Sequence, residues 1–149
     1  PGDDNHDTSL IGGDMEAALQ TPPMEGAFEA IKVLAEHFDH QVWLISKCGP
    51  RIQERTRWWL ARHQFWRKAN MNVDHIRFCR KRHEKAPLCE KLGITHFIDD
   101  RPDCLEPMRG IVEHRFLFGP QKREPHDNVC RVMTWADVQL KVLATLEAA

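Results

Sequence analysis

The chain has 149 residues, of which 42% are apolar and 29% charged, and its net charge is −1 at pH 7. These values are typical of one globular domain with a buried core, and they exclude collagen-like, coiled-coil and low-complexity chains. The sequence has no apolar run of the roughly 20 residues that a membrane-spanning helix needs, and no recognisable signal peptide. We therefore expect neither membrane insertion nor secretion.

The charges are unevenly distributed along the chain. Residues 1–39 contain nine acidic residues and one lysine, whereas residues 51–91 contain twelve basic and four acidic residues. Such a basic segment can attract a phosphate or a nucleic acid, although a solvated helix face is the commoner explanation for any single arginine. Trp58, Trp59 and Trp66 lie in the same segment and either pack against a sheet or stack on bases.

The five cysteines are odd in number and none of them forms a C-x-x-C pair. This pattern favours reduced thiols in a cytoplasmic protein over a disulfide framework or a zinc site.

The predicted elements begin after an acidic, Gly- and Pro-rich opening. Residues 1–23 predict a loop or flap that ends at a Pro-Pro pair. Apolar residues spaced three and four apart predict a helix over residues 24–38, and the apolar run 41–45 predicts a buried parallel strand. After the turn at residues 46–50, Pro50 suits the first turn of a helix that runs to about Trp66.

The second half of the chain continues this alternation. It predicts strands at 75–79, 94–98, 115–118 and 129–133, and helices at 84–92, 102–109 and 135–146. Gly93 ends the first of these helices and Thr134 caps the last. Strands that alternate with helices predict an α/β fold of three layers, Rossmann-like, with a parallel sheet covered by helices on both faces. Residues 24–149 are expected to form a single domain.

Ligands of an open parallel sheet bind at the carboxyl ends of its strands. There the sequence places Ser46, the adjacent carboxylates Asp99 and Asp100, and, in the basic segment, Lys85. Two adjacent carboxylates suit Mg²⁺, which prefers oxygen ligands. Alternatively, an acid such as Asp100 or Asp103 caps the helix that begins at Pro102. Both interpretations remain open on this pattern alone.

Three segments together resemble motifs of the haloacid dehalogenase superfamily of phosphohydrolases. Residues 42–46 (VWLIS) resemble its second motif, 85–93 (KAPLCEKLG) its third, and 94–101 (ITHFIDDR) its fourth. They follow one another in the family's order and separation. The chain's last segments, 115–120 (RFLFGP) and 133–138 (MTWADV), resemble the ends of small nucleotidase-like members, so the similarity covers roughly residues 24–146.

The resemblance implies a Mg²⁺-dependent phosphomonoesterase. In it, one Asp attacks the phosphorus to form an aspartyl-phosphate, and a second Asp two residues later is general acid and base. Ser46 would hydrogen-bond the phosphoryl group, and Lys85 would offset its charge. Asp99 would hold Mg²⁺ with Asp100 or, as some members space these acids further apart, with Asp103.

The sequence departs from the family at the first motif, an apolar strand that ends in D-x-D. No apolar strand precedes any of the early acids, which are Asp3, Asp4, Asp7 and Asp14. Because that strand is central in the family's sheet, we expect the central strand to be missing. Either about ten to twenty native residues precede Pro1, which we favour because the other motifs are intact, or the domain is degenerate or borrows a strand.

The leading hypothesis is thus a hydrolase without a cap domain that acts on a nucleotide or another small phosphomonoester. Lys47 and Arg101 lie beside the site in sequence and are the expected substrate contacts. The alternatives are a catalytically inactive fold that serves protein interaction and a nucleic-acid-binding module that uses residues 51–91.

Overall fold

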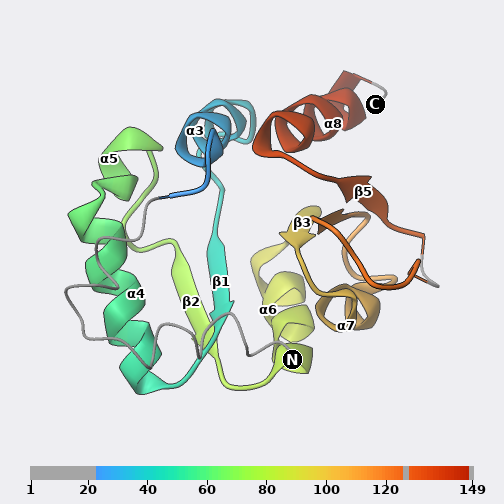
Figure 1. The fold of residues 1–149 in the computed structure, drawn as a ribbon, viewed down its shortest axis with the longest axis horizontal. Helices are drawn as coiled ribbons and strands as arrows, with labels where there is room; N and C mark the ends of the chain where they lie inside the picture. Colours follow the sequence, from blue (N-terminus) through green and yellow to red (C-terminus); the bar gives the residue numbers. More distant parts are fainter. Residues whose placement is uncertain (1–22, 126–127, 148–149) are drawn as a thin grey trace. The chain divides into compact units, whose positions relative to one another are not determined.

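The computed structural model describes residues 23–125 and 128–147 (Figure 1). The predicted flap, apart from Pro23, lies outside these residues. The contacts within the chain divide it into two compact units, Pro1–Arg80 and Lys81–Ala149. Both are mixed α/β units in which a small parallel sheet is flanked by helices. The proposal that residues 24–149 form one domain stays a prediction.

The first unit is built around two parallel strands, β1 (Leu44–Lys47) and β2 (Ile76–Cys79). Helix α3 (Ala27–His37) precedes β1, and helices α4 (Pro50–Arg62) and α5 (Phe65–Lys68) connect the two strands. This is the βαβ connection that parallel strands require and that the alternating pattern predicts.

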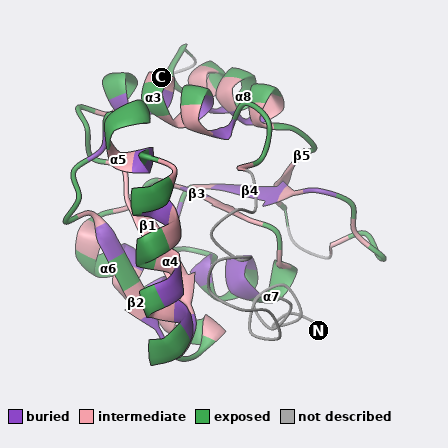
Figure 2. Cartoon of the chain, turned by 60° about the vertical axis from the view of Figure 1, so that its left-hand side comes forward, coloured by how far each residue is buried: buried purple, intermediate pink, exposed green. Residues whose placement is uncertain are grey.

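In the first unit, apolar side chains of the helices pack against side chains of the β1-β2 sheet and form the core. Five buried residues form its centre, namely Leu60, Phe65, Ala69, Met71 and Ile76. Phe28 of α3 meets the Phe65 ring edge-on with the centroids 5.1 Å apart, and Leu44 and Phe78 pack on the cluster from the strands. In Figure 2 α4 shows buried and exposed stripes, as expected for a helix that covers a core.

The second unit contains three parallel strands in the order β3 (His96–Asp99), β4 (His114–Phe118) and β5 (Cys130–Val132). Its elements outside the sheet are the helices α6 (Lys85–Leu92), α7 (Pro102–Leu105) and α8 (Trp135–Glu147) and the 3₁₀ turns η1 (Arg82–Glu84) and η2 (Glu106–Met108). Arg115, buried in β4, donates a hydrogen bond of 3.0 Å to the Leu105 carbonyl and so ties α7 to the sheet.

Several boundaries differ from the predicted ones for local reasons. The first strand begins at Leu44 rather than at residue 41, because its ladder starts where the Leu44 amide meets the His75 carbonyl. Its residues are half-buried rather than buried. Helix α4 ends at Arg62 instead of near residue 66, since Gln64 adopts a left-handed conformation with φ 56°.

The helix predicted at 102–109 is divided into α7 and η2. Pro107 has no amide proton for the α-helical ladder, and the chain tightens to a 3₁₀ turn there. The two predicted helix-end signals are confirmed: Gly93, at φ 70°, ends α6, and the Thr134 hydroxyl accepts a hydrogen bond of 3.1 Å from the Asp137 amide at the start of α8. Strand β3 is shifted from the predicted 94–98 to 96–99, so Asp99 lies inside the strand rather than after it.

The predicted single sheet with helices on both faces is not what the described residues form. Their strands belong to two sheets, β1-β2 and β3-β4-β5. Consequently β1 and β3 are both edge strands within residues 23–125 and 128–147. None of the helices described is long and apolar enough to cross a bilayer.

An unpredicted histidine pair spans β3 and β4. His96 and His114 are register partners, and their rings stack with the centroids 4.4 Å apart. The Thr145 hydroxyl donates to the Val142 carbonyl, so it accepts from His96 Nε2 at 2.7 Å. His96 Nδ1 is therefore the nitrogen that accepts from the Thr95 hydroxyl at 2.7 Å.

Burial lowers the pKa of His96 to about 4, with a further lowering by the neighbouring His114, while Glu113 opposes it. The unfolded chain takes up this proton near pH 6.5 and the folded chain only near pH 4. The stability due to neutral His96 is therefore complete above pH 6.5 and falls as the pH decreases towards 4.

We predict that His96→Asn weakens the dependence of the melting temperature on pH between 7.5 and 5. Thermal unfolding followed by circular dichroism measures this, with the exposed His83→Asn as the control variant. An unchanged pH dependence in His96→Asn would show that other groups cause the acid destabilisation.

Candidate active site at the end of strand β3

The candidate site centres on a buried ion pair between Lys85 and Asp99. The Lys85 Nζ atom lies 2.8 Å from Asp99 Oδ2, and the two side chains are only 10% and 7% exposed. Lys85 Nζ also lies 5.9 Å from the centre of the Phe97 ring. Because a charge removed from water needs an opposite charge, each member of this pair requires the other.

Local structure brings the two residues together. Lys85 is the first residue of α6, directly after the η1 turn, in which the Lys81 amide donates to the Glu84 carboxylate at 2.9 Å. Ala86 and Cys89 are the other buried residues of α6, so Lys85 belongs to the side of the helix that packs inward. Asp99 is the last residue of β3, so its side chain lies at the carboxyl edge of the sheet, where ligands of parallel sheets bind.

Asp99 has two further neighbours that fix its carboxylate. The Arg101 amide donates a hydrogen bond of 3.0 Å to Asp99 Oδ1. The buried Cys104 thiol also hydrogen-bonds Asp99. Burial raises the pKa of Cys104 to about 12, and the charge of Asp99 raises it further against the opposing effect of Lys85. Cys104 is therefore a protonated thiol that donates to the carboxylate, and not a nucleophile.

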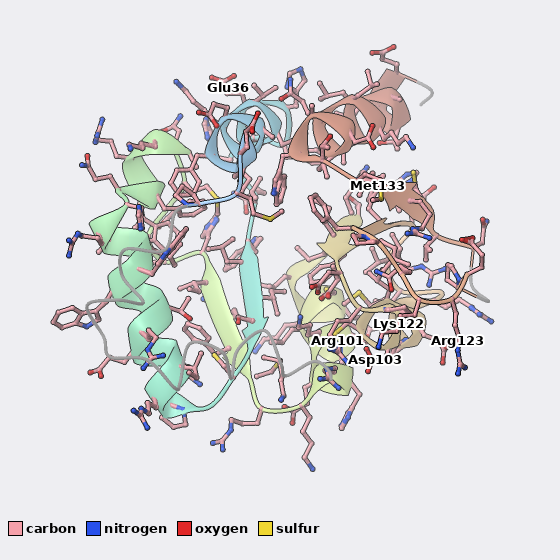
Figure 3. All side chains as sticks on the ribbon, in the orientation of Figure 1. Glu36, Arg101, Asp103, Lys122, Arg123 and Met133 are labelled. Atoms are coloured by element: carbon pink, nitrogen blue, oxygen red, sulfur yellow. The ribbon has the colours of Figure 1, made fainter. Side chains whose placement is uncertain are left out.

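A second set of charges, two of them half-buried, is contributed by Arg82, Arg101 and Asp103. Asp103, whose side chain is 54% exposed, lies 3.3 Å from Arg82 and 3.3 Å from Arg101. Figure 3 shows Arg101 and Asp103 next to each other. Asp100 is exposed, and its carbonyl accepts a hydrogen bond of 3.0 Å from Gln121 of the loop after β4. Asp100 and Asp103 thus both remain candidates for the second metal-binding acid.

Ser46 and Lys47 belong to the first unit. Both are half-buried residues at the end of β1, and Ser46 is inside the strand rather than after it as predicted. The Ser46 hydroxyl lies 3.9 Å from the sulfur of Cys48. Their roles towards a phosphoryl group stay predictions.

Sequence reasoning missed three of the groups around Asp99. No sequence motif marks Cys104, because a cysteine outside a C-x-x-C pair cannot be told from one that merely packs in the core. Gln121 is 21 residues from the Asp100 carbonyl that it binds, so no local pattern could reveal it. Arg82 could have been recognised, since it lies one helical turn before Lys85.

The donors at this strand end suit Mg²⁺. Asp99, Asp100 and Asp103 offer hard carboxylate oxygens within five residues. Proteins commonly hold Mg²⁺ by one or two carboxylates together with water and substrate phosphate. Within the described residues, no cluster of three or more His, Cys, Asp or Glu side chains is arranged to hold a metal. A metal here would complete its coordination with water or substrate oxygens.

No protein-family model matches the chain, and no curated protein sequence matches it significantly. The geometry of the described residues is therefore the basis for assigning a function.

We predict that Lys85→Met destabilises the protein by about 3 kcal/mol, because it leaves the Asp99 charge buried without its partner. Adding Asp99→Asn removes that charge, so the double variant should be more stable than Lys85→Met alone. Urea unfolding followed by circular dichroism measures the free energies of the wild type, of Lys85→Met and Asp99→Asn singly, and of the double variant.

The matched control is Lys91→Met at the exposed end of the same helix. It should change the free energy of unfolding by at most about 0.5 kcal/mol. Strictly additive effects of the two substitutions would contradict an energetic coupling between Lys85 and Asp99.

Proposed function

We propose that the chain is part of a Mg²⁺-dependent phosphomonoester hydrolase of the haloacid dehalogenase type. The observation that supports this is the buried contact of 2.8 Å between Lys85 and Asp99. The resemblance assigned these residues to different motifs, a lysine before a helix and an acid after a strand. Their contact is what a shared active site requires, and a purely local similarity would not produce it.

The strand arrangement gives the proposal separate support. Each sheet is parallel, and β1 and β3, which end in the second and fourth motifs, are edge strands among the described residues. The fold that the resemblance implies also has a further parallel strand, which ends in D-x-D. The nucleophilic Asp would come from that strand.

Each residue has a defined part in this mechanism. The nucleophilic carboxylate would attack the phosphorus, the ester P–O bond would break, and the second Asp of D-x-D would protonate the leaving alcohol. That Asp would then take a proton from a water molecule that attacks the phosphorus, which breaks the bond to the nucleophile and releases inorganic phosphate. Lys85 offsets the negative charge of the carboxylates and of the phosphoryl oxygens as they approach each other. The resemblance implies that Ser46 would hydrogen-bond a phosphoryl oxygen, and Lys47 and Arg101 stay the expected substrate contacts.

Asp99 would hold Mg²⁺ with Asp100 or Asp103, and the metal, when bound, offsets charge on the transferring phosphoryl group. Lys85 keeps the Asp99 carboxylate in a fixed orientation before the metal binds, and the Arg101 amide and the Cys104 thiol restrict its rotation. Such a preorganised carboxylate needs little rearrangement when the substrate arrives. The substrate class is a nucleotide or another small phosphomonoester.

The cysteines agree with a cytoplasmic location, which we also propose. All five lie within the described residues and are outside any disulfide there, and four of them are buried. A compartment that keeps thiols reduced suits such a set.

We predict that Asp99→Asn lowers Mg²⁺-dependent phosphate release by about 100-fold or more in the complete native protein, because the variant loses a charged metal ligand. Release from p-nitrophenyl phosphate and from nucleoside monophosphates is measured with MgCl₂ and with EDTA.

Glu90→Gln, an exposed carboxylate on α6, is the control and should retain full activity. Phosphate release that is absent from the native protein under all these conditions would contradict the hydrolase and favour an inactive fold that serves protein interaction. Release that persists in Asp99→Asn would contradict the proposed metal site.

A further inference from the structure

We propose that the exposed face of α4, extended by α5, binds single-stranded nucleic acid by stacking a base on Trp58 and holding phosphates with the surrounding arginines. The proposal concerns the first unit alone and does not depend on the hydrolase activity.

Helix α4 has two chemically different sides. Ile52 and Leu60 are buried, and Trp59 is half-buried against the core. The exposed face consists of the helix positions Pro50, Arg51, Glu54, Arg57, Trp58, Ala61 and Arg62. Trp58 is thus the one large apolar side chain of α4 on its exposed face, where the other apolar residues are Pro50 and Ala61.

The three tryptophans of the basic segment, Trp58, Trp59 and Trp66, differ in how far they are exposed. Trp59 packs edge-on against Phe28 with the centroids 6.1 Å apart, and Trp66 packs similarly against Phe65 at 5.1 Å. These two rings are part of the core. Trp58, in contrast, is 56% exposed. An indole that presents this much surface to water can stack on an unpaired base, since every base has an aromatic face.

Charge around Trp58 is strongly positive. Five exposed basic residues lie on α4 and α5, namely Arg51, Arg57, Arg62, Arg67 and Lys68, whereas Glu54 is the single acidic residue of these two helices. Clustered arginines and lysines attract the phosphates of a nucleic acid.

The spacing along α4 places base and phosphate contacts in one row. Arg51, Trp58 and Arg62 are separated by seven and four residues, so at 3.6 residues per turn they lie within about 40° of one another around the axis. At 1.5 Å per residue, the row places Arg51 about 10 Å and Arg62 about 6 Å from Trp58 along the helix. A strand that runs along α4 can therefore contact an arginine on each side of a stacked base.

An exposed indole between arginines favours single-stranded nucleic acid over other anionic partners. In a duplex the bases already stack on one another, so Trp58 would have no free base face to contact. An acidic peptide would pair with the arginines but has no flat aromatic group for the indole. A membrane surface requires a broad apolar stripe, whereas the exposed face of α4 offers only Trp58 and Ala61 besides Pro50 and the charged residues.

The test is fluorescence anisotropy of a 5′-labelled oligothymidylate of 20 nucleotides with the whole protein at several salt concentrations. We predict that Trp58→Ala weakens binding about tenfold, because stacking on one base is lost. Trp58→Phe, which keeps an aromatic ring, should retain most of the affinity. The double variant Arg51→Gln/Arg62→Gln should reduce the slope of log affinity against log salt by about 1.4.

Arg123→Gln, an exposed arginine in the loop after β4, is the charge control and should bind like the wild type. Circular dichroism verifies that each variant is folded. Equal affinity for a 20-base-pair duplex, full displacement by poly-glutamate, or an unchanged affinity of Trp58→Ala would each overturn the proposal. Binding below detection at 50 mM salt would overturn it as well.

Discussion

The ion pair between Lys85 and Asp99 removes two opposite charges from water at the end of β3. Its cost in desolvation is large, and the further donors to the Asp99 carboxylate, the Arg101 amide and the Cys104 thiol, offset part of it. These requirements hold the start of α6 against the end of β3 and determine the path of the loop towards α7. Much of the local structure of the second unit follows from satisfying this one pair.

The same constraint explains why the site resembles an active site rather than a stabilising device. A buried ion pair seldom stabilises a fold more than packed apolar residues of similar volume would. Lys85 and Asp99 stand at a position where ligands of parallel sheets bind, and further charges lie nearby in the sequence on the half-buried Arg82 and Arg101 and on the exposed Asp103. Under the proposed function, Asp99 would hold a metal ion and Lys85 would offset the charge of a phosphoryl group.

In the first unit, α4 has one side that packs on the core and an exposed side, which is the surface that we propose for nucleic-acid binding. Leu60 and Trp59 pack on the core that the Phe65 ring completes, and this packing fixes the orientation of the helix. The opposite side is then free to present Trp58 and its arginines to water. The basic charge of this segment is visible in the sequence, but which of its tryptophans face outward depends on the helix phase.

The sequence by itself determined the order and type of most elements, because apolar periodicity and residues such as Pro50, Gly93 and Thr134 act locally. It also placed Lys85 and Asp99 in motifs that could belong together. Only the tertiary structure decided that they touch, that Cys104 and Gln121 join the site and that the strands separate into two sheets. These features depend on contacts between residues distant along the chain and on which face each helix buries, and neither is encoded in a local pattern.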